Sequence, residues 1–256
     1  MQRVVVVSDL HCGHRTGLTH PIYNAGTENF KDTFEMRRKL WDWYKKEITG
    51  LKPIDYLISN GDVIEGKGTR NTGIELLSSD RNVQTDMAVA ALKIADAKEY
   101  HFTYGTGYHT GPEDDWEVQV AARFDTVPVN SLPLQIGKTK FDIRHYLGSS
   151  SSPVGRFTAL SREQVWTAIW AMTQEEFKAD ILIRSHVHYF GSCQNNMGLM
   201  ISTPALQGPG TNYGARQMSG VVDFGFIHFD IEKNGDFTWK CHLLKLAPKK
   251  SAVVKR

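Results

Sequence analysis

A set of aspartate and histidine residues stands at or just after the predicted ends of strands, and these residue types suit metal-assisted chemistry. The set comprises Asp9, His11, Asp62, His109, His145, His186 and His188. Carboxylates and imidazoles together suit Mn, Fe, Zn or Ni. Two such ions about 3.5–4 Å apart can generate a hydroxide and hold the oxygens of an in-line displacement at phosphorus. The first hypothesis is therefore a metal-dependent hydrolase that acts at phosphorus.

Short apolar runs precede most of these residues and predict the strands that position them. The runs span residues 4–7, 56–59 and 181–183, and they lead into Asp9, Asp62 and His186. Residues 101–104 are predicted as a further strand that ends at Gly105. Runs that are apolar throughout are typical of strands buried on both faces. The segments between them have helical periodicity, with helices predicted over residues 31–49 and 83–95. This alternation predicts parallel strands whose ligand sites lie beyond their carboxyl ends.

The second half of the chain has a different pattern. Two hairpins are predicted, over residues 132–143 and over residues 224–244, where Asn234-Gly235 supplies the turn. Ser161 and Gln164 have the spacing of a capping box and predict the start of a helix. The aromatic residues that follow in this helix are expected in the hydrophobic core of the protein; they are Trp166, Trp170 and Phe177. The fold predicted is an α/β fold with two sheets, as a single domain over residues 1–247 and a basic tail over residues 248–256.

Composition and charge are those of an ordinary globular protein. Hydrophobic residues make up 41% of the chain, charged residues 23%, and the net charge is only +2. This balance does not by itself indicate a nucleic-acid partner, which usually requires a strongly basic patch. Cys12, Cys193 and Cys241 are too scattered for a disulfide framework or a CxxC zinc site. With no predicted leader and no long apolar run, we expect a cytoplasmic protein without a membrane partner.

Five short motifs occur in the order that calcineurin-like metallophosphoesterases show. They are Ser8-Asp9-Leu10-His11, Asn60-Gly61-Asp62, Tyr108-His109, the lone His145, and Ser185-His186-Val187-His188. The chain thus resembles that superfamily, and in particular its compact stand-alone prokaryotic or phage-borne members. The resemblance implies a four-layer α/β/β/α sandwich, with mixed sheets flanked by helices. It also implies two divalent metal ions, with Mn favoured among Mn, Fe, Ni and Zn.

The resemblance implies a role for each motif residue. Asp9, His11 and His188 would hold one ion, His145 and His186 would hold the other, and Asp62 would bridge the two. His109 matches the histidine that assists the leaving group without binding metal.

Two departures from the family's pattern affect these roles. Tyr108 stands where the family has an asparagine ligand, so Thr106, a backbone carbonyl or water would have to replace that oxygen. Thr110 stands where an acidic residue often follows the histidine, and Asp114 and Asp115 are candidates to orient the imidazole of His109 instead.

Contacts to substrate are less marked in the sequence. Arg156, Asn212 and Arg216 could meet a phosphate, although each also fits an ordinary loop position. His14 and His20 are expected on an exposed loop, and His242 on a solvated strand face. The leading function is phosphodiester hydrolysis by a hydroxide bound to a two-metal centre. The alternatives are a nuclease of the same superfamily, acting on a nucleotide or nucleic acid, and a binding scaffold that has lost catalysis.

Overall fold

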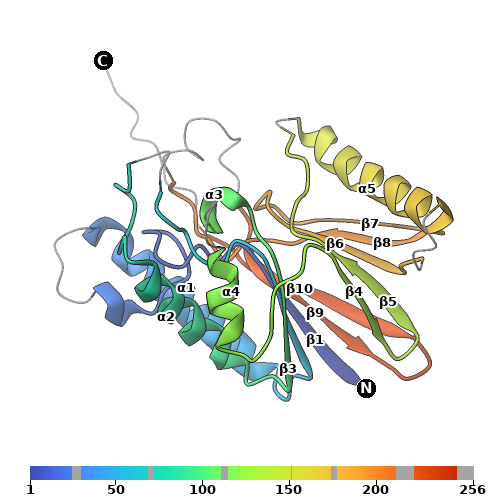
Figure 1. The fold of residues 1–256 in the computed structure, drawn as a ribbon, viewed down its shortest axis with the longest axis horizontal. Helices are drawn as coiled ribbons and strands as arrows, with labels where there is room; N and C mark the ends of the chain where they lie inside the picture. Colours follow the sequence, from blue (N-terminus) through green and yellow to red (C-terminus); the bar gives the residue numbers. More distant parts are fainter. Residues whose placement is uncertain are drawn as a thin grey trace.

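The computed structural model describes residues 1–24, 30–68, 72–110, 115–150, 152–173, 178–211 and 222–246. Three of the candidate site residues, Asp114, Asn212 and Arg216, lie outside these ranges, as do Phe177 and the basic tail. Two five-stranded sheets face one another, with helices on their outer faces (Figure 1).

The first sheet has the strand order β10-β9-β1-β2-β3. Its strands are β1 (Gln2–Val7), β2 (Tyr56–Asn60), β3 (Glu99–Thr103), β9 (Phe224–Ile231) and β10 (Phe237–Leu244). β1, β2 and β3 are parallel, whereas β9 and β10 form an antiparallel hairpin that joins the sheet through β1. The parallel part and the hairpin both follow the sequence pattern.

The second sheet has the order β4-β5-β6-β8-β7. Its strands are β4 (Leu132–Ile136), β5 (Thr139–Ile143), β6 (Ile181–Arg184), β7 (Gly191–Asn195) and β8 (Gly198–Ser202). β5, β6 and β8 are parallel, and β4 and β7 are antiparallel edge strands. The mixed character of both sheets is that of the expected fold.

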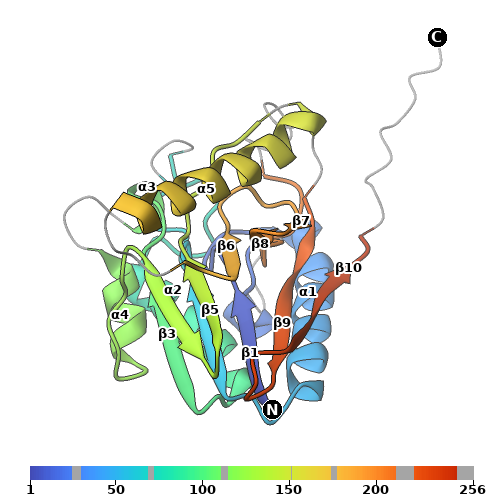
Figure 2. The same cartoon turned by 90° about the vertical axis from the view of Figure 1, so that its right-hand side faces the viewer.

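Three apolar clusters separate the four layers. The helices α1 (Lys31–Gly50), α2 (Arg81–Leu92) and α4 (Trp116–Ala122) bury one face against the first sheet. A second cluster fills the space between the sheets. A third lies between the second sheet and α5 (Pro153–Thr173), which crosses its outer face (Figure 2). The predicted α/β/β/α architecture is thereby confirmed.

The strand β1 shows how an apolar run becomes a strand buried on both faces. Val5 and Val7 point to the helices, and Val4 and Val6 point to the other sheet. Successive side chains alternate across a strand, so both faces must be apolar when layers cover both of them.

Several sequence expectations are wrong. The helix α5 begins at Pro153 rather than at Ser161, whose hydroxyl donates to the carbonyl of Phe157 within the helix. Proline suits the first helical position because its missing N–H has no intrahelical partner there. Trp166 is 47% exposed and not a core residue. The hairpin of β7 and β8 was not predicted from the sequence at all.

Two histidines expected at the surface are buried. His14 lies under its own loop, where its Nδ1 is 2.9 Å from Thr16 Oγ1. His242 is covered by α1, and its Nδ1 is 3.0 Å from Glu47 Oε2. Among the described helices, none combines the length and the apolar character that crossing a bilayer requires.

Candidate metal centre

The loops that follow β1 and β2 run side by side and form the base of the site. The amide of Asp9 donates to the Gly61 carbonyl, and the amide of His11 donates to the Asp62 carbonyl, each at 3.0 Å. Because parallel strands end at the same edge, the two motif loops begin together and remain hydrogen-bonded to one another. This pairing sets Asp9, His11 and Asp62 around one point.

The backbone at the predicted ligands is strained. Positive φ angles occur at Asp9 (51°), His11 (46°), Asp62 (51°), His186 (75°) and His188 (56°). A non-glycine residue adopts this region at a cost, and such residues cluster at functional sites. Within the described chain, five of the nine non-glycine residues with positive φ are thus predicted ligands.

Two glycines allow the close packing around Asp62. A Cβ on Gly61, whose φ is 77°, would lie 2.5 Å from the His145 ring, and a Cβ on Gly105 would lie 2.3 Å from Asp62 itself. Such approaches are too short for any larger residue. Glycine is therefore required at position 61 both by its positive φ angle and by the lack of space for a side chain.

The predicted ligands come together in two triads. In each triad, one ligand atom from every residue lies within 4.8 Å of the others. The first triad is Asp9, His11 and His188, and the second is Asp62, His145 and His186. A third grouping, of His11, Asp62 and His109, lies between them. The sequence thus placed all seven residues at one site, although their part in metal binding stays a prediction.

In the first triad, neighbouring groups orient the histidines toward a common centre. Glu65 is an acceptor only, so His11 donates from Nδ1 to it at 2.9 Å, and the Nε2 lone pair faces inward. His188 Nε2 lies 3.2 Å from His11 Nε2 and 3.2 Å from Asp9 Oδ1. Asp9 Oδ1 is buried and has no hydrogen-bond partner. A cation would satisfy this oxygen and both nitrogens.

The second triad has the same arrangement. His145 donates from Nδ1 to the Asn60 carbonyl at 2.7 Å, so its Nε2 faces Asp62 Oδ2 at 3.0 Å. Two lone pairs repel at this distance unless a proton or a metal ion lies between them. His186 Nδ1 lies 3.9 Å from the same oxygen and is another buried atom without a partner. The donor set therefore fits a divalent ion of the kind bound by nitrogen and oxygen ligands.

The titration behaviour of these groups follows from the same geometry. Burial lowers the pKa of His145, but the charge of Asp62 outweighs it and raises that pKa to about 10. Burial would raise the pKa of Asp9, yet the neighbouring His188 lowers it well below its usual range. Burial and the nearby His109 lower the pKa of His11 to about 4. The anionic Asp9 and the neutral His11 are in the protonation states that metal binding requires, whereas His145 would release its proton when an ion binds.

His109 lies on α3 (Gly107–Thr110), at the open side of the centre. Its Nδ1 is 3.1 Å from the Glu65 carbonyl, and its ring is 4.5 Å from that of His11. Since a carbonyl only accepts, Nδ1 is the donor and Nε2 is the atom left to act on a ligand. Tyr108 packs edge-on against His109 at 4.7 Å. Thr106 donates its amide to Asp62 Oδ1 at 2.6 Å, and its hydroxyl lies 3.1 Å from the same oxygen.

A buried polar network beneath the predicted metal ligands joins the two sheets; we call it the polar floor. Its side chains come from the ends of β1, β2, β3, β6 and β8, and all are buried: Ser8, Asn60, Thr103, Ser185 and Thr203. Thr203 Oγ1 lies 2.8 Å from Ser8 Oγ and 2.7 Å from Ser185 Oγ. Asn60 donates to Ser185 at 2.6 Å and accepts from Thr103 at 2.6 Å. The polar floor therefore links Ser8, which precedes Asp9, with Ser185, which precedes His186.

The remaining described candidates, Arg156 and Asp115, contact residues other than the predicted ligands. The Arg156 guanidinium lies 4.2 Å from the Tyr189 ring centroid, on the first turns of α5. Asp115 caps α4 by accepting the amide of Glu117 at 3.0 Å. Their roles in binding substrate or orienting His109 stay predictions.

Sequence reasoning missed two carboxylates and one aromatic side chain of the site. Glu65 holds His11, and its position three residues after Asp62 was the available signal. Glu117 is fully buried and accepts the Val63 amide at 3.0 Å; burial raises its pKa to about 8. Tyr146 is 64% exposed, and its ring lies 5.1 Å from that of His186. No sequence pattern distinguishes Glu117 or Tyr146, because only the tertiary fold brings them here.

Comparison with known proteins gives likenesses of fold only. No protein-family model matches the chain, and no curated protein matches it. The zinc complex of Vps29 from Entamoeba histolytica is 16% identical over 94% of this chain and 99% of its own, with a TM-score of 0.47. An archaeal phosphodiesterase is 13% identical over 95% of this chain and 100% of its own, with a TM-score of 0.48. A predicted phosphoesterase from Streptococcus pneumoniae is 12% identical, covering 94% and 98%, with a TM-score of 0.39. At these identities and TM-scores, the likenesses carry no argument about function.

Proposed function

We propose that this chain is a metal-dependent phosphoesterase of the calcineurin-like type, with phosphodiesters as its main substrates. The observation that carries the proposal is the pair of triads, Asp9-His11-His188 and Asp62-His145-His186, set on strained loops at the ends of both sheets. Bound divalent ions would supply Lewis acidity toward water and toward the phosphoryl oxygens.

The residues of the chain provide orientation and proton transfer. Glu65 and the Asn60 carbonyl fix the tautomers of His11 and His145, so that both Nε2 atoms face the centre. His109, His186 and His188 are the partly exposed side chains of the set, at 16%, 30% and 18%, so a substrate would reach them first. A proton from His109 to the departing oxygen would assist an alkoxide, which is a poor leaving group.

Preference for diesters is proposed on grounds of charge. A monoester dianion is usually held by several arginines. The described candidate arginine, Arg156, holds its guanidinium over the ring of Tyr189. A diester monoanion needs less positive charge.

Metal content and hydrolysis, measured on the same preparations, test the proposal. The expected result for the wild type is two bound divalent ions per chain and hydrolysis of a bis-aryl phosphate at least as fast as of the matched aryl monoester. Asp62→Asn should lose both metal and activity. The matched control is Asp236→Asn, which changes an aspartate at the β9–β10 turn, at the opposite end of β1.

The outcomes separate the candidate functions. Metal binding without hydrolysis of any ester would favour the scaffold. Hydrolysis of DNA or RNA in preference to small diesters would favour the nuclease. Absence of metal from the wild type, after dialysis against each of Mn, Fe, Ni and Zn, would contradict the proposal.

A further inference from the structure

The outer face of α5 is apolar although it faces solvent. Six of the twelve large hydrophobic side chains that are exposed in the described chain lie on this one helix. They are Val154, Phe157, Val165, Trp166, Ile169 and Met172. Their spacing follows one helical face, which we call the α5 stripe. The opposite face, with Ala159 and Leu160, is already used to cover the second sheet.

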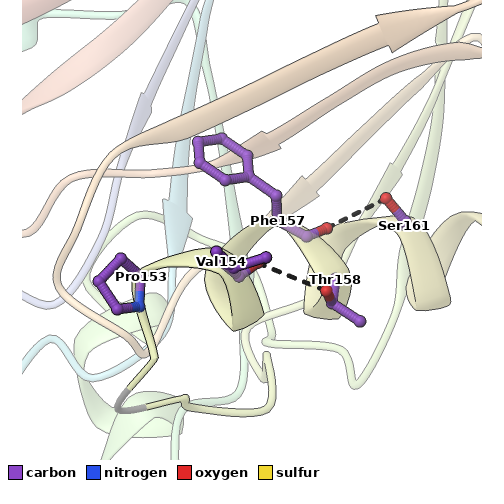
Figure 3. A pocket seen from close by; sticks show the side chains of 5 residues that line it. All are labelled: Pro153, Val154, Phe157, Thr158 and Ser161. Atoms are coloured by element: carbon purple, nitrogen blue, oxygen red, sulfur yellow. Dashed lines mark hydrogen bonds between the residues drawn. The ribbon is translucent and has the colours of Figure 1, made fainter.

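Polar groups interrupt the α5 stripe very little. Among the exposed positions of α5, all of which the structure describes, Arg162 is the one charged residue. Its guanidinium lies beside Gly148, and one of its nitrogens is 2.7 Å from the position that a Cβ on this glycine would occupy. The hydroxyls of Thr158 and Ser161 donate back to the carbonyls of Val154 and Phe157, at 3.4 and 3.0 Å (Figure 3). Covering these hydroxyls would therefore leave no donor without a partner.

The exposed area is close to that of a protein interface. Given the size of these side chains, exposed fractions of 40% to 86% leave roughly 700 Å² of the stripe open to solvent. Each partner in a standard stable interface contributes about 800 Å². Single exposed apolar residues are normal on a protein surface, whereas a continuous patch of this size usually marks an interaction site.

The order of residues along α5 fits a second copy of the same helix. When two α5 helices are set antiparallel about a point between Ser161 and Arg162, Val154 faces Ile169 and Thr158 faces Val165. Phe157 and Trp166 lie about half a turn apart around the helix and flank this central row on opposite sides. The central row thus pairs Val154 with Ile169, and it pairs Val165 with a threonine whose hydroxyl already donates within its own helix. A two-fold symmetric interface demands this self-complementarity, because each contact must occur twice.

The position of α5 leaves room for such a partner. The helix packs on β7 and β8 and stands at the edge of the molecule, apart from α1, α2 and α4 (Figures 1 and 2). A membrane surface fits less well, because helices that lie on membranes carry several Lys and Arg residues beside the apolar face. With Arg162 alone, the stripe also offers little charge with which to select an unlike protein.

We propose that the α5 stripe is a homodimer interface, in which two copies of the chain pack their α5 helices antiparallel about a two-fold axis. Each metal centre is built within one chain, so the proposal stands independently of the proposed function.

The first test is the oligomeric state, measured by light scattering and sedimentation up to about 100 µM, which detects dimers with micromolar Kd. The wild type should be dimeric. Phe157→Glu and Trp166→Glu should each weaken dimerisation by roughly 100-fold, because each replaces a large aromatic side chain of the stripe by a charge that has no partner on the other copy. Both positions are exposed in the monomer, so the fold and the bound metal should be unchanged. The control is Val127→Glu, which alters another exposed valine and should remain dimeric.

The second test is the register, measured by oxidative cross-linking with Cys193 and Cys241 replaced by serine. The variant carrying both Thr158→Cys and Val165→Cys should form a disulfide-linked dimer. Thr158→Cys alone should not, because the two copies of this position would be about 10 Å apart along the helix axis. A monomeric wild type, a dimer that survives Trp166→Glu, or a monomer that binds lipid vesicles through α5 would each overturn the proposal.

Discussion

Thr203 holds the polar floor together, and replacing it by valine tests how the two sheets are joined beneath the site. Its hydroxyl lies 2.8 Å from Ser8 Oγ and 2.7 Å from Ser185 Oγ, and it donates to the Arg184 carbonyl at 3.3 Å. Valine has nearly the same shape, so Thr203→Val removes the hydrogen bonds without opening a cavity. The change therefore isolates the polar contribution.

The cost follows from which groups lose their partners. Ser8 can still donate to the Pro204 carbonyl at 3.2 Å, and the Arg184 carbonyl keeps the amide of residue 203 at 2.8 Å. Ser185, which accepts from Asn60, is left with a buried hydroxyl proton and no acceptor. One unsatisfied buried donor costs about 1–3 kcal/mol, so the free energy of unfolding should fall by that amount. Because Ser8 and Ser185 adjoin Asp9 and His186, metal affinity should also fall, by roughly 10-fold.

The assay combines urea unfolding in chelator with metal titration by calorimetry. Thr139→Val is the matched control, since Thr139 is also buried and donates only to the Gly235 carbonyl, at 3.0 Å, away from the site. The control should lose about 1 kcal/mol of stability and none of its metal affinity. If the two variants bound metal equally well, or if Thr203→Val cost under about 0.5 kcal/mol, the polar floor would not position the ligands.

Three further predictions concern proton transfer, metal removal and pH. His109→Ala should keep its metal and lose roughly 10²- to 10⁴-fold in rate on alkyl esters, with a much smaller loss on activated aryl esters; an equal loss on both would contradict the acid role. Chelation should lower the midpoint of thermal unfolding and re-addition of Mn should restore it, because ions that bind only the folded chain stabilise it; an unchanged midpoint would contradict a bound ion. Burial and the facing His242 lower the pKa of His228 to about 4, so its contribution to stability is complete above the unfolded value of about 6.5 and is lost as the pH falls toward 4. When the pH falls from 7 to 5, His228→Gln should lose about 1 kcal/mol less of its free energy of unfolding than the wild type loses, a value reduced by the solvent that screens this half-buried ring. Urea titrations at the two pH values measure this difference, and an identical pH dependence of the two proteins would refute it.

The strands of the first sheet, and the meeting of the polar residues that follow β1 and β2, can be predicted from the sequence alone. Residues 4–7 and 56–59 are apolar on both faces, and only a strand covered on both sides accommodates that pattern. The polar residues directly after them had to meet at one edge, because parallel strands end together. The apolar runs and the residues that follow them are therefore enough to place Asp9 and Asp62 side by side.

The surroundings of these predicted ligands depend on the tertiary fold. Glu117 reaches the site from α4 and Tyr146 from the segment after β5, and neither position follows from local pattern. The start of α5 was misplaced because Ser161 and Gln164 have the spacing of a cap, while the true start depends on Pro153. Trp166 was expected in the core because helical periodicity shows which residues share a face but not whether another layer covers that face. In this chain no described layer covers the face of α5 that carries Trp166. A face covered within the chain becomes core, whereas a face left uncovered is available as an interface.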